Sequence, residues 1–354
     1  MEANQETSDF GDELFLVPCG AEAFLLHAPL RHISALVNRT VADEIRNTFQ
    51  TGATDKLSPC ARSLLARLRT APRACLQPLS GDYAPEHMDL FVTNDCNMRC
   101  RYCLAAAGES PPAYMTTDIC RTALDFYVET IRRSGRKAMK LVYLGGEPLL
   151  AYDVLRFANE YGRHLAGRHG LSFESELTTN GFMSEYRARW MAQNLSHVIV
   201  SMDGPPECHD QYRRDLSGRG THTVVDRTIR ILQNERTPFA LRCSIDADRI
   251  SLLVSMVGFM VQQYRPREVA IEPVLEDGRC IVQRIRSPDP RSFIREAIKA
   301  AEIAIAAGVE VVFRNSQPDL LLSSHCSLAR DPFVVTCDGY VSACCRIETR
   351  QTNG

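Results

Sequence analysis

A polar turn that carries three closely spaced cysteines constrains this chain more than any other stretch. Cys96, Cys100 and Cys103 follow an apolar, strand-like run at residues 90–92, and the next cysteine is Cys120. A cubane 4Fe-4S cluster normally takes four thiolates, and the spacing C-x3-C-x2-C offers three from one turn. A cluster bound here would keep one iron open, as a catalytic metal centre needs and a sealed structural one does not.

Two other readings of this turn fit less well. A zinc loop favours a C-x2-C pair matched by a second such pair, and no second pair is present. Three unrelated core thiols would not gather on a turn whose other residues are polar or charged. Those residues are Asn94, Asp95, Asn97, Arg99 and Arg101.

With Tyr102 just before the last cysteine, the turn resembles the signature of the radical S-adenosylmethionine (radical SAM) enzymes. The resemblance extends from about residue 90 to residue 344. It implies that the open iron chelates the amino and carboxylate groups of S-adenosylmethionine. It further implies that the reduced cluster cleaves this cofactor to a 5′-deoxyadenosyl radical, and that Tyr102 packs near the adenine.

A second motif, Gly145-Gly146-Glu147-Pro148, follows the next predicted strand. Two glycines let a backbone approach a ligand closely, and a carboxylate can accept a hydrogen bond from an ammonium group. The stretch resembles the family's GGEP motif, which implies contact with the methionine amino group of the cofactor. An ordinary turn is the alternative, because a Gly-Gly pair alone is a weak signal.

A third motif begins at Ser201 with the sequence Ser-x-Asp-Gly-Pro, and Arg213 follows twelve residues after the serine. Both positions resemble the family pattern. The resemblance implies that Ser201 contacts the ribose or carboxylate end of the cofactor and that Arg213 pairs with its carboxylate, which a guanidinium fork suits. The alternative for Arg213 is an ordinary surface arginine. The sequence identifies no catalytic base.

Strands and helices alternate over residues 85–315, which predicts a parallel sheet with right-handed crossovers. The predicted strands lie at residues 89–93, 140–144, 171–178, 197–202, 239–245 and 268–273. Six β-α units are two short of a closed eightfold barrel, so we expect an α/β fold with an open, partial (β/α)6 TIM-like barrel. The family resemblance implies the same fold. All three motifs fall at strand ends, where such sheets bind ligands.

Residues 1–84 are predicted to form a small N-terminal α+β domain. Three short apolar strands precede two helices, and a proline-rich stretch at 72–85 marks the boundary. This order resembles the winged-helix peptide-binding domain of enzymes that modify ribosomal peptides. The resemblance implies that a leader peptide adds to the edge of its sheet. A cap that only packs on the barrel is the alternative.

Residues 316–354 are predicted to form a cysteine-rich hairpin extension around an Asp-Gly turn. Its cysteines resemble the opening of the SPASM extension, which implies one auxiliary iron–sulfur cluster held by Cys326, Cys337 and Cys344. A zinc hairpin or buried thiols are the alternatives. The later SPASM cysteines are absent, so we expect a truncated extension. Cys345 stands where sulfatase-maturing relatives carry an aspartate, which argues against formylglycine formation.

The composition excludes several classes of function. The net charge is −2, so neither a nucleic-acid nor a membrane partner is expected. No run of eighteen apolar residues and no signal peptide are visible. Fourteen cysteines without a secretion signal favour metal ligands and buried thiols in the reducing cytoplasm.

The sequence therefore predicts a radical SAM enzyme that abstracts hydrogen from a C–H bond of a peptide or protein, leading to a crosslink, an epimerisation or an oxidation. Its reductant would be a flavodoxin or ferredoxin. One alternative is dehydrogenation or rearrangement of a small molecule. An alternative of another class is a non-catalytic iron–sulfur or zinc module. The sequence does not specify the substrate, the bond formed or the oligomeric state.

Overall fold

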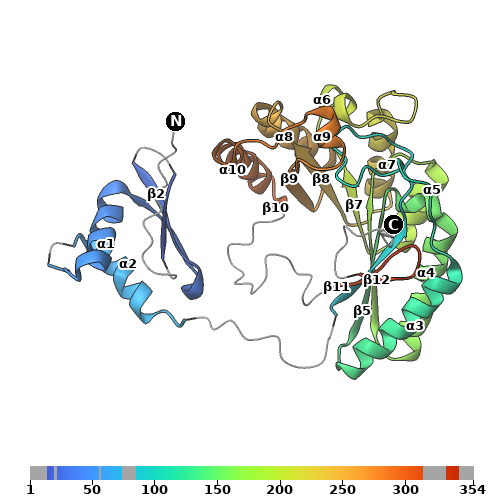
Figure 1. Cartoon of the computed structure of the whole chain (residues 1–354), viewed down its shortest axis with the longest axis horizontal. Coiled ribbons are helices and arrows are strands. Elements are labelled where there is room, and N and C mark those ends of the chain that lie inside the picture. Colours follow the sequence, from blue (N-terminus) through green and yellow to red (C-terminus); the bar gives the residue numbers. More distant parts are fainter. Residues whose placement is uncertain (1–13, 20–21, 56, 74–84, 314–331, 343–354) are drawn as a thin grey trace, which may run out of the picture. The chain divides into compact units, whose positions relative to one another are not determined.

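The computed structural model describes residues 14–19, 22–55, 57–73, 85–313 and 332–342 (Figure 1). The chain divides into two units. The described residues up to position 73 belong to the first, and all later ones belong to the second.

The first unit is a three-stranded antiparallel sheet with two helices, as the sequence predicted. Its elements are β1 (Phe15–Pro18), β2 (Ala23–Ala28), η2 (Pro29–Arg31), β3 (Ile33–Asn38), α1 (Arg39–Thr51) and α2 (Pro59–Thr70). The side chains of Asn38 and Ser58 cap the two helices by accepting hydrogen bonds from backbone N–H groups in the first turn. Leu26 and Ile45 are fully buried in a core that belongs to this unit alone.

The second unit is built on a nine-stranded sheet in the order β10-β9-β8-β7-β6-β5-β4-β11-β12. Its elements are β4 (His87–Thr93), α3 (Thr117–Arg133), β5 (Ala138–Gly145), η3 (Pro148–Ala151), α4 (Tyr152–Arg168), β6 (Ser172–Thr179), α5 (Glu185–Asn194), β7 (His197–Ser201), α6 (Pro206–Tyr212), α7 (His222–Asn234), β8 (Phe239–Ile245), η4 (Ile250–Leu252), α8 (Leu253–Tyr264), β9 (Glu268–Pro273), α9 (Arg279–Gln283), α10 (Pro290–Ala306), β10 (Glu310–Phe313), β11 (Pro332–Val335) and β12 (Val341–Ser342). All neighbours from β10 to β11 run parallel.

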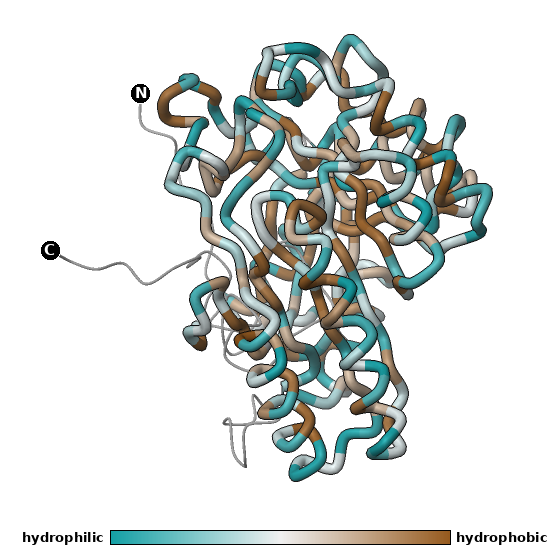
Figure 2. The backbone as a smooth tube through the Cα atoms, turned by 90° about the vertical axis from the view of Figure 1, so that its right-hand side faces the viewer, coloured by the Kyte–Doolittle hydropathy of each residue, from teal (hydrophilic) through white to brown (hydrophobic). Residues whose placement is uncertain are grey.

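The predicted fold class is confirmed. The six predicted strands correspond to β4–β9, with ends displaced by only a few residues. In β5, Leu141 and Tyr143 are fully buried in the core shared with the covering helices. The alternate residues Lys140 and Leu144 are half-buried on the opposite face of the sheet. Figure 2 shows hydrophobic stretches gathered in the interior and hydrophilic ones on the outer turns.

The described part of the C-terminal segment joins the barrel sheet. β11 pairs with β4, with Val334 opposite Asp89, and then turns back as β12. Two short helices, α6 and α9, were not predicted, because each spans at most two turns and shows too little periodicity to detect. Both follow strand ends, where they contribute to the site described below.

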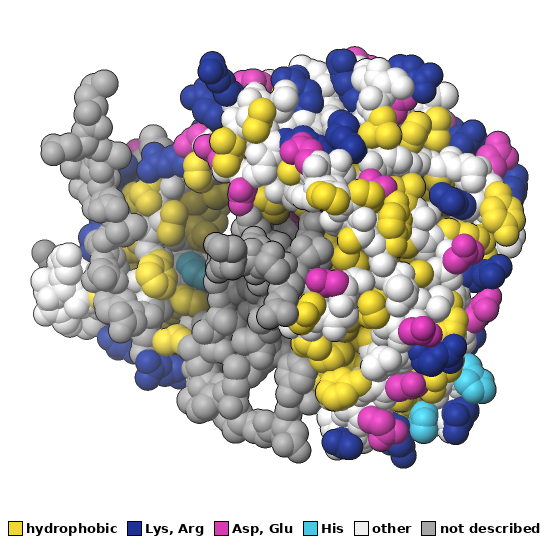
Figure 3. All heavy atoms as spheres, turned by 45° about the vertical axis from the view of Figure 1, so that its right-hand side comes forward, with side chains coloured by type: hydrophobic (Ala, Val, Ile, Leu, Met, Phe, Trp, Pro, Cys, Tyr) yellow, Lys and Arg dark blue, Asp and Glu magenta, His cyan; other side chains and the backbone are white. Residues whose placement is uncertain are grey.

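No described helix combines the length and apolar character needed to cross a bilayer. On the face in Figure 3, Lys and Arg side chains are interspersed with Asp and Glu.

We expect Leu26→Ala to destabilise the N-terminal unit by about 2–5 kcal/mol, the usual cost of a cavity in a packed core. Backbone amide exchange around Ile45 in α1 should accelerate, while exchange in β5 of the other unit stays unchanged. The matched control is Leu36→Ala, because Leu36 lies in the same sheet with 73% of its surface exposed. If amides around Ile45 exchange at the same rate in Leu26→Ala and Leu36→Ala, Leu26 does not belong to a core that stabilises this unit.

Candidate active site

The three predicted cluster cysteines lie together on the loop after β4. Cys96 is 8% exposed and packs with Met98 and Ala107, while Cys100 and Cys103 are half-buried against the same group. The loop also makes its own turns, since Cys103 N–H donates to the carbonyl of Cys100 at 3.2 Å. One short segment therefore presents all three thiols on the carboxyl side of the sheet.

Three thiols on one loop are a donor set that suits an iron–sulfur cluster. Among the described residues, no three His, Cys, Asp or Glu side chains converge closely enough to hold one ion. Each thiolate of a cubane binds its own iron, so cysteines that hold a cluster stand further apart than those around one zinc. Burial raises the pKa of Cys96 to about 12 and that of Cys100 to about 11. A bound cation would offset this, because coordination stabilises the thiolate.

The glycines of the second motif have a packing role against this loop. The backbone N–H of Gly146 donates to the Thr93 carbonyl at 2.9 Å, and that of Glu147 donates to the Asp95 carbonyl at 2.8 Å. A Cβ on Gly146 would lie 2.3 Å from the Asp95 oxygen. Only glycine permits this approach, so the two motifs are joined backbone to backbone.

Glu147 is 1% exposed and connects the ends of β5 and β6. Its carboxylate accepts hydrogen bonds from the Thr179 hydroxyl at 2.9 Å, the Asn180 N–H at 2.7 Å and the Leu149 N–H at 3.1 Å. Burial raises the pKa of Glu147 to about 7, although these hydrogen bonds oppose the shift. Asn180 also donates to the Asn97 side chain at 2.8 Å, which ties the end of β6 to the cysteine loop.

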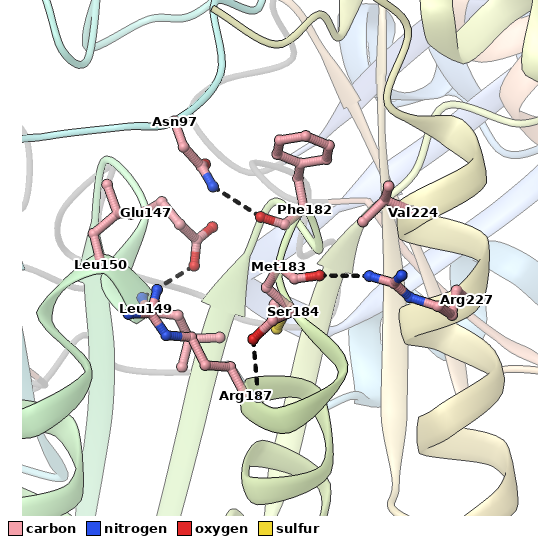
Figure 4. Close-up of a pocket in the computed structure, with 10 residues that line it drawn as sticks. All are labelled: Asn97, Glu147, Leu149, Leu150, Phe182, Met183, Ser184, Arg187, Val224 and Arg227. Carbon is pink, nitrogen blue, oxygen red and sulfur yellow. Dashed lines mark hydrogen bonds between the residues drawn. The ribbon is translucent and has the colours of Figure 1, made fainter.

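A cavity of about 500 Å³ adjoins Glu147 (Figure 4). It is lined by Asn97, Glu147, Leu149, Leu150, Phe182, Met183, Ser184, Arg187, Val224 and Arg227. In Figure 4, Arg187 extends toward Glu147, and Arg227 donates to the Met183 carbonyl at 2.7 Å. The cavity thus combines apolar walls with two cations, beside the turn that carries the second motif.

The third motif surrounds a fully buried carboxylate, Asp203. It accepts a hydrogen bond from the Tyr102 hydroxyl, and both Nε and Nη2 of Arg213 lie within 3.3 Å of its oxygens. Arg249 Nη1 lies 3.6 Å away. Burial alone would raise the pKa of Asp203, but the two guanidinium groups outweigh it and hold the pKa below its ordinary value.

Stacked side chains extend this cluster. The Arg249 guanidinium lies 3.6 Å from the ring centroid of Tyr212, which stacks on Tyr102 at 5.7 Å. Arg249 also donates to the Asp246 carboxylate at 2.9 Å. Arg213 is only 5% exposed, which excludes the surface-residue alternative.

Ser201 ends β7 two residues before Asp203 and is half-buried, in register with Arg242 of β8. Pro148 begins the short helix η3 directly after Glu147. The structure therefore places the predicted cofactor-binding residues in the segment that follows β4 and at or just after the ends of β5 and β7, with Arg213 at the end of α6. Their contacts with the cofactor stay predictions.

Comparison with known proteins assigns the central part of the chain. Residues 90–243 match the Radical SAM superfamily. This segment is a radical SAM domain. The Radical SAM match implies a 4Fe-4S cluster and S-adenosylmethionine as the cofactors of this segment.

The relatives of this radical SAM domain include maturases. Over 162 residues the chain is 27% identical to the cysteine-type anaerobic sulfatase-maturating enzyme of Clostridium perfringens, a match that covers 44% of this chain and 43% of the relative. The chain thus spans less than half the length of that relative.

Two solved structures share the fold. One is anSMEcpe with bound AdoMet and Cp18Cys peptide, at a TM-score of 0.61 and 20% identity, covering 74% of each chain. The other is Streptococcus suis SuiB bound to its precursor peptide SuiA, at a TM-score of 0.57 and 10% identity, covering 97% of this chain and 84% of SuiB.

Several residues of the radical SAM domain's site were not predicted from the sequence: Asp203, Tyr212, Asp246, Arg249 and Arg279. Asp203 stands inside the third motif, which was the available signal. Arg249 and Arg279 lie outside any motif, and only the structure shows that they are 2% and 7% exposed.

Of the predicted auxiliary-cluster ligands, the structure describes Cys337 alone. Cys326 and Cys344, like the adjacent Cys345, lie outside the described residues. Cys337 follows β11 and is 2% exposed. The auxiliary cluster therefore stays a prediction.

We expect the stability of the protein without its cluster to depend on pH through Glu147. Its folded-state pKa of about 7 exceeds the ordinary 4.5, so the folded state binds the proton more tightly. Relative to Glu147→Gln, the wild-type free energy of unfolding should fall as pH rises from 4.5 to about 7, then level off.

Urea unfolding can be followed by fluorescence of Trp190, the only tryptophan, which packs against the core of the second unit. The matched control is Glu302→Gln, an exposed glutamate in α10. If the two variants show the same pH dependence, Glu147 is not the group responsible.

Proposed function

We propose that this chain cleaves S-adenosylmethionine reductively and uses the resulting radical to abstract hydrogen from a C–H bond of a peptide or protein substrate. The observation that carries the proposal is the direct backbone contact between the cysteine loop and the Gly145–Pro148 turn. A catalytic centre of this kind needs both the cysteines that hold the cluster and a turn beside them that binds the cofactor. A non-catalytic metal module would need the cysteines but not the cofactor-binding turn.

In this proposal Cys96, Cys100 and Cys103 hold the cluster, whose open iron binds the cofactor and supplies the electron for its cleavage. The turn around Gly146 and Glu147 faces the methionine amino group. This is compatible with the buried carboxylate, because each carboxylate oxygen accepts more than one hydrogen bond.

Arg213 is suited to bind the cofactor carboxylate. A guanidinium has five N–H donors, and Asp203 faces Nε and Nη2, so donors are left for a second carboxylate. Asp203 also fixes the plane of the fork, which removes much of the ordering cost of binding. Tyr102, held by the same carboxylate, is positioned to pack against the adenine, and Ser201 lies on the neighbouring strand end.

A peptide substrate is favoured by the two structural neighbours, one described with a bound peptide and the other with its precursor peptide. The match to SuiB covers 97% of this chain, so it takes in the N-terminal unit as well. The edge strands of that unit's sheet, β1 and β3, offer backbone groups to which a leader peptide can add as a further strand. A flavodoxin or ferredoxin would supply the electron.

The first test is cofactor cleavage by anaerobically reconstituted protein. We expect the wild type to release 5′-deoxyadenosine with a strong chemical reductant, and Cys96→Ala, Cys100→Ala and Cys103→Ala each to abolish release, because each removes one iron ligand. The control is Cys60→Ala, an exposed cysteine in the N-terminal unit. Release at the wild-type rate by any of the three variants would sink the proposal.

A second test concerns Arg213. Arg213→Lys keeps a cation beside Asp203 but loses the planar fork, and Arg213→Ala loses both. We expect Arg213→Ala to weaken S-adenosylmethionine binding by about 1.5–3 kcal/mol, the range for a hydrogen bond to a charged group, with Arg213→Lys in between.

Calorimetric titration of each reconstituted variant measures this. Arg219→Ala is the control, since the Arg219 side chain is 77% exposed and pairs with Asp215 instead. Unchanged affinity in Arg213→Ala would mean that Arg213 only neutralises Asp203.

A further inference from the structure

The segment after β9 lies directly against the cysteine loop, although no motif marks it. The Arg279 N–H donates to the carbonyl of Cys103 at 3.0 Å. A Cβ on Gly278 would lie 2.1 Å from the Leu104 oxygen and 2.6 Å from that of Cys103. Gly278 also has φ +54°, which favours glycine. The two backbones therefore touch at the third cysteine.

The Arg279 side chain then spans the loop from the inside. It is 7% exposed, and it donates from Nη1 to the Cys100 carbonyl at 3.2 Å and from Nη2 to the Ala107 carbonyl at 2.5 Å. Its Nε donates to the carboxylate of Glu109. One planar fork thus joins a cluster cysteine to the far end of the same loop, a geometry that lysine cannot reproduce.

The neighbouring residue adds a further contact. Cys280 Sγ lies 3.6 Å from the carbonyl of Tyr102. On its other flank the loop is held by the segment after α6, since Arg99 N–H donates to the Arg214 carbonyl at 2.7 Å. Two arginine side chains reach across the loop interior: Arg279, and Arg99, which donates to the Cys96 carbonyl and to the Gly108 carbonyl, each at 2.8 Å.

This placement also puts a buried positive charge beside Cys100, whose carbonyl accepts the hydrogen bond from Arg279 Nη1. Among the described residues, Arg279 forms an ion pair with one carboxylate, that of Glu109. The Glu109 side chain is 54% exposed, so water screens its charge more than it screens the buried guanidinium. The net charge and hydrogen bonds around a cluster set its reduction potential. A nearby cation favours the reduced form, which carries one more negative charge.

We propose that Arg279 is a positioning residue of the radical SAM domain, which holds Cys100 and Cys103 in place through the loop backbone and raises the reduction potential of the cluster. The second half of this inference rests on the proposed function. The first half concerns the chain alone and can be tested without a cluster.

The positioning role is tested by hydrogen–deuterium exchange on the full chain without iron. The amides to follow are those of Cys103 and Ala106, which donate within the loop to Cys100 and Cys103. We expect both amides to exchange at least about tenfold faster in Arg279→Gln, because the variant loses hydrogen bonds from a charged group. The increase in Arg279→Lys should be smaller. Arg286→Gln, an exposed arginine on the same connection, is the matched control. Exchange equal to that control overturns the positioning role.

The electrostatic role is tested by redox titration of the reconstituted cluster, followed by electron paramagnetic resonance. Arg279→Gln should shift the midpoint to a more negative potential, and Glu109→Gln to a more positive one. Arg279→Lys should stay near the wild type, because it keeps the charge. A midpoint in Arg279→Gln equal to that of Arg286→Gln overturns this role. If the wild type binds no cluster, the proposed function fails, while the exchange experiment still decides the positioning role.

Discussion

The buried carboxylate of Asp203 is the interaction on which the rest of the site depends. It receives the Tyr102 hydroxyl from the cysteine loop, the Arg213 guanidinium from the end of α6 and the Ser244 N–H from β8. Removing a carboxylate from water is costly. Removing one partner of a buried ion pair destabilises a protein by about 3–5 kcal/mol, because the other charge is left buried and uncompensated. The three segments are therefore constrained to meet at this point.

The parallel sheet makes such a meeting possible. Because β4–β9 run in the same direction, every loop that follows a strand opens on one edge, and residues far apart in sequence become neighbours there. Glu147 connects the ends of β5 and β6 in the same way that Asp203 connects the segments after β4 and β7 with β8. Arg279 extends the pattern to β9. Buried charged groups thus link the segments at the strand ends of this open sheet.

These contacts fix the positions of side chains at the site before a ligand binds. In the proposed function, Tyr102 and Arg213 contact the cofactor. A side chain that packing and hydrogen bonds already fix loses little further freedom on binding. Tyr102 and Arg213 are fixed by Asp203 before any ligand arrives. The N-terminal unit has its own core, and the two edge strands of its sheet are β1 and β3, to which a peptide would add in the function proposed above.

The sequence by itself determined the features that are local or periodic. The spacing of Cys96, Cys100 and Cys103 and the Gly145–Pro148 turn are short patterns, and the alternation of strands and helices predicted the open barrel because hydrophobic periodicity reports which face of an element is buried.

Only the tertiary structure decided which distant residues meet. Arg279 contacts Cys100 across 179 positions of the chain, and Tyr102 contacts Asp203 across 101. Nor does any local signal show that Gly146 touches Asp95, or that β11 joins the sheet beside β4. Such contacts carry no period and no motif, because they arise from how the whole sheet brings its strand ends together.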